Sequence, residues 1–498
     1  MSRKPKNHTG LKVVLILLIL AMIVATAYVI KLCLGVVNME ADPRPSGTVQ
    51  LPTAGENEAE PTTEAPTETT MPEPEHVVTT ATIGSMGDLL MHEPIFNYAN
   101  SAVLQPDGSY DFESVFRYLT EYTSALDYAA ANLETTLCGT DNGYPYHGYP
   151  NFNCPDQVVD GAKNAGFDML LTANNHSYDT SLVGYKRTVE VIRDKGLETL
   201  GTYASADETK WTVQEINGIN IGMLCYTYAY SVTQDGRPSL NGMPHIAEQG
   251  LCNYFHSDSL DTFYAEVGTY LEEMKAAGAE ATILYIHWGV EYQLTANNEQ
   301  KTMAQKLCDM GVDVIIGGHP HVVQPVQLLE STVDPEHKTV CLYSMGNAVS
   351  NQRLGNISYI NTAHTEDGVL FTVTFEKYSD GTVYLAGADA IPTWVNMHSN
   401  SGGKREYNIL PLDYDRVGEW TEMFDIGDNT LNAAKNSYER TMAIVGEGLA
   451  ASQAWLEEEK VQREEYYYDL AMNPEKYATE ATEAFVEEPT EVETTEAA

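Results

Sequence analysis

The chain has 498 residues, of which 43% are hydrophobic, so it is long enough to bury a large core and to form about three domains of ordinary size. Its 71 acidic and 28 basic residues give a formal net charge of −43, which disfavours general binding to nucleic acids. The 37 glycines and 22 prolines exclude a fibrous repeat.

The N-terminal segment predicts a membrane anchor. Residues 13–30 are uncharged and almost wholly apolar, and at about 1.5 Å per residue they can span a hydrocarbon core. Basic residues precede this run, so we expect a single-pass protein of the cell membrane with the remaining chain outside the cell. The alternative is a cleaved signal peptide, because Ala25-Thr26-Ala27 has the small-x-small pattern of a cleavage site.

Composition divides the chain into five parts. Residues 1–37 hold the basic tip and the apolar span, and residues 38–76 are a disordered acidic linker of Thr, Pro and Glu. Strand and helix patterns fill residues 77–410. Residues 411–476 have helical spacing and predict a C-terminal helical extension, and residues 477–498 repeat the composition of the linker.

Strands and helices alternate between residues 77 and 410. In chain order the patterns predict strand 77–88, helix 112–126, strand 125–134, helix 156–166, strand 167–176, helix 181–196, hairpin 211–228, helix 259–278, strand 281–289, helix 298–311, strands 312–321 and 339–347, and two antiparallel strands within 368–391. This alternation predicts an α/β fold, a layered sandwich of central mixed β-sheets flanked by helices.

The chain contains seven cysteines, one of which, Cys33, lies next to the apolar span. The other six are an even number, which is compatible with disulfides outside the cell. Cys138, Cys154 and Cys252 lie in loop-like sequence, so we expect one bridge among them.

Polar side chains able to bind a metal follow five successive predicted strands. They are Asp88, Glu134, the run 174–176 (Asn-Asn-His), His287, and His319 with His321. In open α/β sheets, ligands collect beyond the carboxyl ends of the strands. A mixed set of imidazole, carboxylate and amide donors suits Mn, Fe or Zn.

These residues lie in motifs that resemble the capsule-synthesis protein CapA family. The motifs follow the order of that family: GDLLMH (87–92), ANLE (131–134), ANNHSYD (173–179), HWGVEY (287–292), GGHPHVVQP (317–325) and YSMGN (343–347). The resemblance covers roughly residues 80–395. That family is associated with poly-γ-glutamate capsules and is similar to the calcineurin-like metallophosphoesterases, so the resemblance implies their layered fold.

The resemblance also implies two divalent metal ions and a general acid. The metal ligands that it implies are Asp88, His92, Glu134, Asn175, His287, His319 and His321. Glu134 would bridge the two ions, His176 would protonate the leaving oxygen, and Asp179 would orient His176. The Asp-x-His that usually precedes the Gly-Asp is replaced here by residues 83–85 (Ile-Gly-Ser), with His92 as its substitute, so the number of metals stays open.

Three residues are expected to bind substrate: Tyr292, Asn347 and Arg353. Arg353 would clamp an anionic substrate, with a surface salt bridge as the alternative. Asn347 has a strand-end cap as its alternative, and Tyr292 a packing aromatic. His147 lies in a loop rich in Tyr, Pro and Gly. One interpretation is that this loop overhangs the site as an aromatic wall, and the alternative is that His147 is simply exposed to solvent.

The apolar span and the resemblance together predict a membrane-anchored, extracellular, metal-dependent hydrolase in capsule synthesis. Its expected substrate is a phosphoester or an anionic envelope polymer such as poly-γ-glutamate, and its expected partners include other capsule-synthesis membrane proteins. The alternatives are a non-catalytic assembly or anchoring factor that binds the polymer, and a structural protein that keeps a relic of the site.

Overall fold

The computed structural model describes residues 76–473 except residues 244, 357 and 359. The predicted membrane span at 13–30, the linker up to residue 75 and the tail from residue 477 lie outside the described residues. Within residues 76–473, apart from those three gaps, no helix is both long and apolar enough to cross a membrane.

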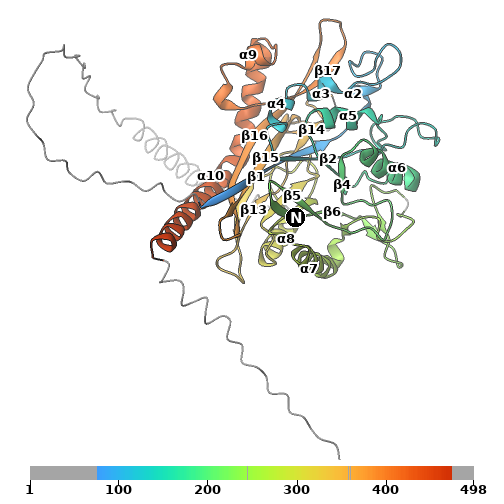
Figure 1. Cartoon of the computed structure of the whole chain (residues 1–498). Coiled ribbons are helices and arrows are strands. Elements are labelled where there is room, and N and C mark those ends of the chain that lie inside the picture. Colours follow the sequence, from blue (N-terminus) through green and yellow to red (C-terminus); the bar gives the residue numbers. More distant parts are fainter. Residues whose placement is uncertain (1–75, 244, 357, 359, 474–498) are drawn as a thin grey trace, which may run out of the picture. The chain divides into compact units, whose positions relative to one another are not determined.

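Two mixed β-sheets lie at the centre of the described part (Figure 1). The strands of the first sheet are β1 (Val77–Leu89), β2 (Tyr128–Leu133), β3 (Met169–Leu171), β4 (Glu198–Leu200), β14 (Asn347–Val349), β15 (Asp367–Tyr378), β16 (Val383–Ser399) and β17 (Arg405–Pro411). Their order is β17-β16-β15-β1-β2-β3-β4, with β14 beside β1. Strands β1 to β4 are parallel, and β15 to β17 extend the sheet in antiparallel pairs.

The second sheet has the order β12-β13-β11-β10-β6-β5, with β9 beside β6. Its strands are β5 (Thr212–Ile216), β6 (Ile219–Tyr228), β9 (Tyr254–Phe255), β10 (Ala281–His287), β11 (Val314–Gly318), β12 (Val326–Glu330) and β13 (Lys338–Leu342). The predicted hairpin is β5–β6, and its turn residues Asn217 and Gly218 both have the positive φ of a tight hairpin turn, 51° and 80°. β7 (Ser231–Val232) and β8 (Pro238–Ser239) form a small separate hairpin.

Helices cover the outer faces of both sheets (Figure 1). The helices are α2 (Glu93–Phe96), α3 (Glu113–Phe116), α4 (Thr120–Thr123), α5 (Gln157–Asn164), α6 (Ser181–Asp194), α7 (Leu260–Ala276), α8 (Asn298–Asp309), α9 (Trp420–Met423) and α10 (Asp428–Met472), with 3₁₀ turns η1 (Ser257–Ser259), η2 (His364–Glu366) and η3 (Tyr414–Arg416). Apolar side chains such as Ile83 on β1 and Ile283 on β10 fill the space between the sheets. The expected mixed α/β layered sandwich is therefore observed as helices, sheet, sheet and helices.

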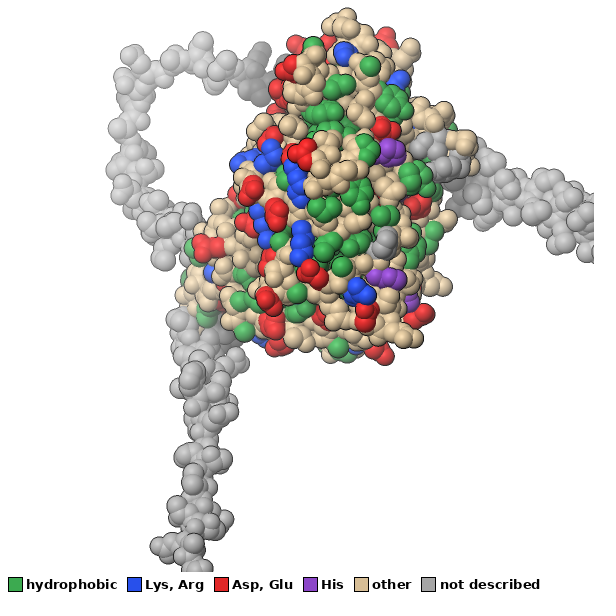
Figure 2. All heavy atoms as spheres, turned by 90° about the vertical axis from the view of Figure 1, so that its right-hand side faces the viewer, with side chains coloured by type: hydrophobic (Ala, Val, Ile, Leu, Met, Phe, Trp, Pro, Cys, Tyr) green, Lys and Arg blue, Asp and Glu red, His purple; other side chains and the backbone are tan. Residues whose placement is uncertain are grey.

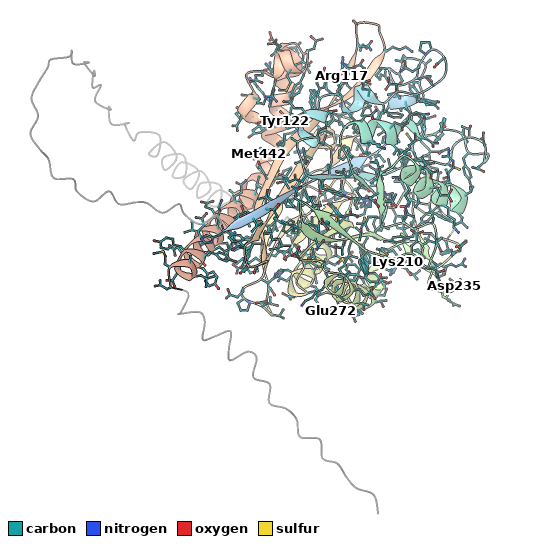
Figure 3. All side chains as sticks on the ribbon, in the orientation of Figure 1. Arg117, Tyr122, Lys210, Asp235, Glu272 and Met442 are labelled. Atoms are coloured by element: carbon teal, nitrogen blue, oxygen red, sulfur yellow. The ribbon has the colours of Figure 1, made fainter. Side chains whose placement is uncertain are left out.

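The predicted C-terminal helical segment is the 45-residue helix α10. Val445, Leu449 and Leu456 of this helix join the core between the sheets, and Met442 packs partly buried against the same core (Figure 3). Arg440 donates from Nη2 and Nε to Asp367 at 2.7 and 2.9 Å. α10 is thus part of the packed fold of the sheets.

Two expectations about local structure are wrong. Residues 112–126 form two single-turn helices rather than one, because the Leu119 N–H donates to the Phe116 carbonyl three residues back and tightens the chain between them. The six cysteines among the described residues are free and buried, so the expected bridge is not formed. Most of these cysteines lie in apolar clusters, where a free thiol packs as a small hydrophobic group and needs no disulfide partner.

Candidate metal centre

The carboxyl ends of the parallel strands bring the predicted ligands of both sheets together. Asp88 on β1 lies in register with Asn132 on β2 and with Asn347 on β14. In the second sheet His287 is the last residue of β10 and lies in register with Gly318, which ends β11 and precedes His319. The polar residues at the carboxyl ends of the strands of both sheets therefore lie close together, as expected for an α/β fold with parallel strands.

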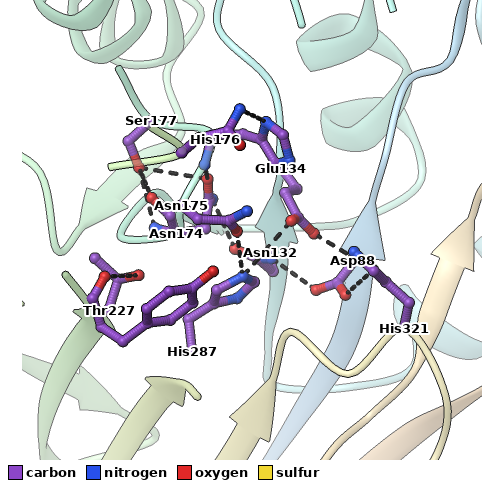
Figure 4. Close-up of polar contacts among 12 residues, drawn as sticks. Asp88, Asn132, Glu134, Asn174, Asn175, His176, Ser177, Thr227, His287 and His321 are labelled. Carbon is purple, nitrogen blue, oxygen red and sulfur yellow. Dashed lines mark hydrogen bonds and ion pairs between the residues drawn. The ribbon is translucent and has the colours of Figure 1, made fainter. Parts of the chain in front are cut away.

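Glu134, the first residue after β2, lies between the histidines of the second sheet (Figure 4). Its Oε1 is 3.5 Å from His287 Nε2, and its Oε2 is 3.9 Å from His321 Nδ1. One ligand atom each of Glu134, His319 and His321 lie within 4.8 Å of one another, and all three side chains are buried. These three residues have the geometry of a metal-binding cluster.

Two further predicted ligands flank Glu134 on opposite sides. Asn175 Oδ1 is 2.8 Å from His287 Nε2, and Asp88 Oδ2 is 3.1 Å from His321 Nδ1. The two oxygens of Glu134 thus face different histidines, and each of these histidines has a further predicted ligand beside it.

The donor atoms fit a divalent cation because several of them have no other partner. Within the described part of the chain, neither oxygen of Glu134 nor Nδ1 of His319 has a hydrogen-bond partner, although these atoms are buried. A buried charged group without a partner is costly, and metal coordination removes that cost. The donors are imidazole nitrogens and carboxylate and amide oxygens, which suit Mn, Fe or Zn.

Burial favours the protonation state that metal binding needs in two of the histidines. Burial lowers the pKa of His287 to about 3, and it lowers the pKa of His319 well below its usual value. Both imidazoles are therefore neutral, which is the form that binds a metal. Burial raises the pKa of Glu134 well above its usual value, and the nearby Asp88 and Glu291 add to that rise. A cation would reverse this shift.

Three asparagines hold the ligands in place. Asn132 Nδ2 donates to Asp88 Oδ1 at 2.7 Å, and Asn174 Nδ2 donates to Asn132 Oδ1 at 3.1 Å. Asn347 Nδ2 donates to the His321 carbonyl at 3.2 Å, and Asn347 Oδ1 lies 3.2 Å from His321 Nδ1. The structure therefore places Asn347 against a predicted ligand, at the edge of the site.

The loop after β11 has an unusual backbone. His319 and His321 have φ values of 95° and 55°, in the left-handed region that side chains rarely adopt. Such conformations cost on the order of 1–3 kcal/mol each and occur at functional sites held by surrounding structure. A Cβ on Gly317 would lie 2.0 Å from the Tyr343 carbonyl oxygen, so the backbones of β11 and of the segment after β13 approach closely here.

His176 and Asp179 form a buried pair next to this cluster. His176 Nδ1 is 2.7 Å from Asp179 Oδ2, and the Phe152 N–H donates to the same oxygen at 2.7 Å. Asn241 Nδ2 donates to the other oxygen, Asp179 Oδ1, at 3.0 Å. Every oxygen of Asp179 is therefore occupied, and Nε2 of His176 is the ring nitrogen left for a substrate.

His92 is not among the three clustered ligands. Its Nδ1 lies 3.2 Å from the Leu90 carbonyl oxygen, and its ring packs edge-on against Phe152 with 5.2 Å between centroids. Burial lowers the pKa of His92 to about 3. Its role as a metal ligand stays a prediction. Ser85, at the position of the missing motif, instead pairs with the hydroxyl of Tyr285 at 3.0 Å in the core.

Arg353 lies in a setting that differs from the expected clamp. Its Nη2 is 2.7 Å from Glu366 Oε2, its Nη1 donates to the Val395 carbonyl, and both charged side chains are largely buried. Glu366 thus neutralises the guanidinium of Arg353. The alternative to the clamp was a salt bridge at the surface, and the structure shows a salt bridge that is buried. The structure gives no support to a substrate role for Arg353.

Tyr292 and the loop of His147 lie closer to the site. The Tyr292 ring centroid is 6.2 Å from that of His321, and its hydroxyl accepts from Gln352 Nε2 at 3.2 Å. In the loop, His147 Nδ1 lies 2.7 Å from the Gly148 carbonyl oxygen, whereas the ring of Phe152 packs 4.7 Å from His176. Phe152 therefore supplies the aromatic wall that was expected from this loop.

The motifs did not include two residues that contact the site. Tyr228, at the end of β6, has its ring centroid 4.7 Å from that of His319 and stacks at 6.3 Å on His287. Asn241 comes from the long connection after β8. The position of Tyr228 at the end of a predicted strand is the one sequence signal that could have placed it at the site. Nothing in the sequence around Asn241 indicates that this residue contacts Asp179.

Two solved structures match a large part of this chain at low TM-scores. A Staphylococcus aureus protein described as a 5′-nucleotidase, in complex with alpha-ketoglutarate, is 13% identical with a TM-score of 0.36, covering 70% of this chain and 58% of that chain. The Thermus thermophilus sulfate thiohydrolase SoxB, in complex with glycerol, is 13% identical with a TM-score of 0.35, covering 73% and 60%. The chain spans less than two thirds of either structure.

A match to a family model, supported by two sequence relatives, identifies the family. The chain is 24% identical over 366 residues to the capsule biosynthesis protein CapA of Bacillus anthracis, covering 70% of this chain and 78% of that protein. It is 27% identical over 244 residues to the PGA biosynthesis protein CapA of Bacillus subtilis (strain 168), covering 48% and 57%. The family model for the bacterial capsule synthesis protein PGA_cap matches residues 82–352, more than half of the chain. The chain therefore belongs to the bacterial capsule synthesis protein family PGA_cap, as its motifs predicted.

Proposed function

We propose that this protein is a metal-dependent hydrolase that acts on a phosphoester or on an anionic polymer of the cell envelope during capsule synthesis. One observation carries the proposal. A buried carboxylate, Glu134, has no hydrogen-bond partner for either oxygen within the described residues, and it lies between His287 and His321. The pair of His176 and Asp179, suited to proton transfer, adjoins it.

The ligands of the cation come from both sheets. They are Asp88, Glu134, Asn175, His287, His319 and His321. A divalent metal bound by them supplies Lewis-acid chemistry that polarises a phosphoryl or carbonyl oxygen. Asn132 and Asn347 position these ligands through the hydrogen bonds described above.

His176 is the proposed general acid. Its Nδ1 proton is held by Asp179, so its Nε2 is free to donate a proton to the leaving oxygen. Asp179 stabilises the charged imidazolium, and it is itself fixed by the Phe152 N–H and by Asn241. The edge-on ring of Phe152 holds the orientation of the imidazole.

Figure 2 shows acidic and basic side chains interspersed with hydrophobic ones on the face that it presents. Arg353 is paired internally, so bound divalent cations would supply the positive charge that neutralises an anionic substrate. Tyr149 is 65% exposed in the loop that leads to Phe152, and Tyr230 is 56% exposed and packs edge-on against Tyr228; both are proposed to contact the polymer.

We further propose that residues 13–30 anchor the protein in the cell membrane with the catalytic domain outside. The envelope polymer, poly-γ-glutamate in particular, is then the nearest anionic substrate. The name of the Bacillus subtilis relative, a PGA biosynthesis protein, supports this choice. Other capsule-synthesis membrane proteins are the proposed partners.

The test is metal analysis of the full-length protein followed by hydrolysis assays. A phosphomonoester, a phosphodiester and poly-γ-glutamate are incubated with the metal-loaded protein and with Glu134→Ala. We expect turnover of at least one substrate by the wild type and loss of bound metal and turnover in the variant. If the metal-loaded wild type binds the polymer and hydrolyses nothing, the protein is a non-catalytic assembly factor.

A further inference from the structure

A cavity lies outside the proposed metal centre. Its volume is about 410 Å³, within the range of small-molecule sites, and none of the predicted metal ligands lines it. Its walls come from α7, from the connection that runs between β7 and η1, and from Lys210. The residues used below are Lys210, Tyr254, Phe255, Phe263, Glu266 and Tyr270.

One wall carries a positive charge. The ammonium of Lys210 lies 4.3 Å from the ring centroid of Tyr203 and donates one hydrogen bond, of 3.0 Å, to the Ala206 carbonyl. The Lys210 carbonyl accepts hydrogen bonds from Tyr203 and Asn253, which fix the backbone of the lysine. An ammonium has three N–H donors, so Lys210 retains donors for a ligand.

The opposite charge is on α7. Glu266 Oε1 accepts from the Tyr226 hydroxyl at 2.8 Å, which holds the carboxylate in a largely buried position. Within the described part of the chain, no ion pair of 4.0 Å or shorter joins Glu266 and Lys210. A third charged wall residue, Glu248, already pairs with Lys186 at 3.0 Å. The cavity therefore separates one positive from one negative group.

This separation selects the charge pattern of the ligand. A simple anion would meet Glu266, and a simple cation would meet Lys210, so either would face one unfavourable charge. A zwitterion satisfies both groups, with its carboxylate on Lys210 and its ammonium on Glu266. Tyr254, Phe255, Phe263 and Tyr270 provide aromatic and apolar walls for the rest of the molecule.

We propose that this cavity binds a free α-amino acid with an apolar side chain. The site is separate from the proposed hydrolase centre, and it does not depend on a metal. It is a binding site for a small zwitterion within a protein whose net charge is strongly negative.

The test is calorimetric titration of the full-length protein with L-phenylalanine. N-acetyl-L-phenylalanine, which lacks the ammonium, and L-phenylalaninamide, which lacks the carboxylate, are titrated in parallel. We expect the free amino acid to bind at least about tenfold more tightly than either blocked form, since each lacks one charge-assisted contact. Absence of binding below about 10 mM, or equal binding of all three, overturns the proposal.

Two variants test the assignment of each charge. Lys210→Met is expected to abolish the preference for L-phenylalanine over the amide, and Glu266→Gln to abolish its preference over the acetylated form. Glu272→Gln is the matched control, because Glu272 is exposed on the same helix (Figure 3). Circular dichroism confirms folding of each variant. Preferences that stay unchanged in both folded cavity variants contradict the proposal.

Discussion

Glu134 Oε1 lies 3.5 Å from His287 Nε2, although the two residues come from different sheets. The contact exists because β2 and β10 both end at the same edge of the sandwich. It brings a carboxylate from the first sheet to an imidazole from the second, and the described residues offer that carboxylate no hydrogen-bond donor. The first prediction concerns this carboxylate.

Glu134→Gln should lower bound metal and yet stabilise the metal-free protein. Burial raises the pKa of Glu134, so the metal-free fold is favoured when this group is protonated, below its usual value of 4.5. That contribution is lost as the pH rises through the raised pKa. The stability of the metal-free variant relative to wild type should therefore increase as the pH rises above about 5. Thermal unfolding in the presence of a chelator, at several pH values, measures this difference in stability. Glu272→Gln is the control variant. A difference between Glu134→Gln and wild type that does not change with pH contradicts the prediction.

His319→Ala should remove metal and the stability that metal confers. His319 Nδ1 is buried without a partner within the described residues, as expected for a ligand atom. A cation that binds only the folded protein raises its stability by mass action, by about 2.7 kcal/mol at 100 times the dissociation constant. The difference in melting temperature with and without added metal should disappear in the variant. An unchanged metal content excludes His319 as a ligand.

His176→Ala should keep the metal and lower turnover by about 10²–10⁴, the usual contribution of general acid–base catalysis. The loss should be smaller for a nitrophenyl ester, because its leaving group departs without protonation. Metal analysis and steady-state rates on both kinds of substrate check this. Equal losses on both substrates argue against proton donation by His176.

Asn241→Ala should lower turnover more mildly than His176→Ala, and Asp179→Asn should fall between them. Asn241 Nδ2 lies 3.0 Å from Asp179 Oδ1 and 3.1 Å from His176 Nδ1, so it contacts both members of the pair. The loss from Asn241→Ala should therefore appear in kcat and should not add to the loss from Asp179→Asn in the double variant. Asn142→Ala, which removes a hydrogen bond to the Cys138 carbonyl, is the matched control. If the losses of turnover from Asn241→Ala and Asp179→Asn add in the double variant, Asn241 acts independently of the pair of His176 and Asp179.

Arg353→Met should destabilise the fold by about 3–5 kcal/mol, because it leaves the buried Glu366 without its partner. The double variant Arg353→Met, Glu366→Gln should recover part of this loss. Chemical denaturation of the single and double variants measures both effects. A stable Arg353→Met variant with a raised KM for an anionic substrate would restore the clamp interpretation.

The sequence alone determined the family and the edge of the fold at which the polar residues gather. Asp88, Glu134, His287 and His319 stand at the ends of apolar runs, and parallel strands must present such ends on one side. The hairpin at Asn217-Gly218 followed from local turn chemistry. These features depend on neighbouring residues in the chain, so patterns of neighbours were sufficient to predict them.

Only the tertiary structure decided which partners the functional groups have. The sequence motifs do not show that Asn241 reaches Asp179, that Tyr228 covers His319, or that Glu366 occupies Arg353. Nor do they show that the two oxygens of Glu134 face different histidines. Each of these contacts joins residues that are distant in the chain or separated by a turn, and its existence depends on how two sheets pack. Packing is a property of the whole core, and no local pattern encodes it.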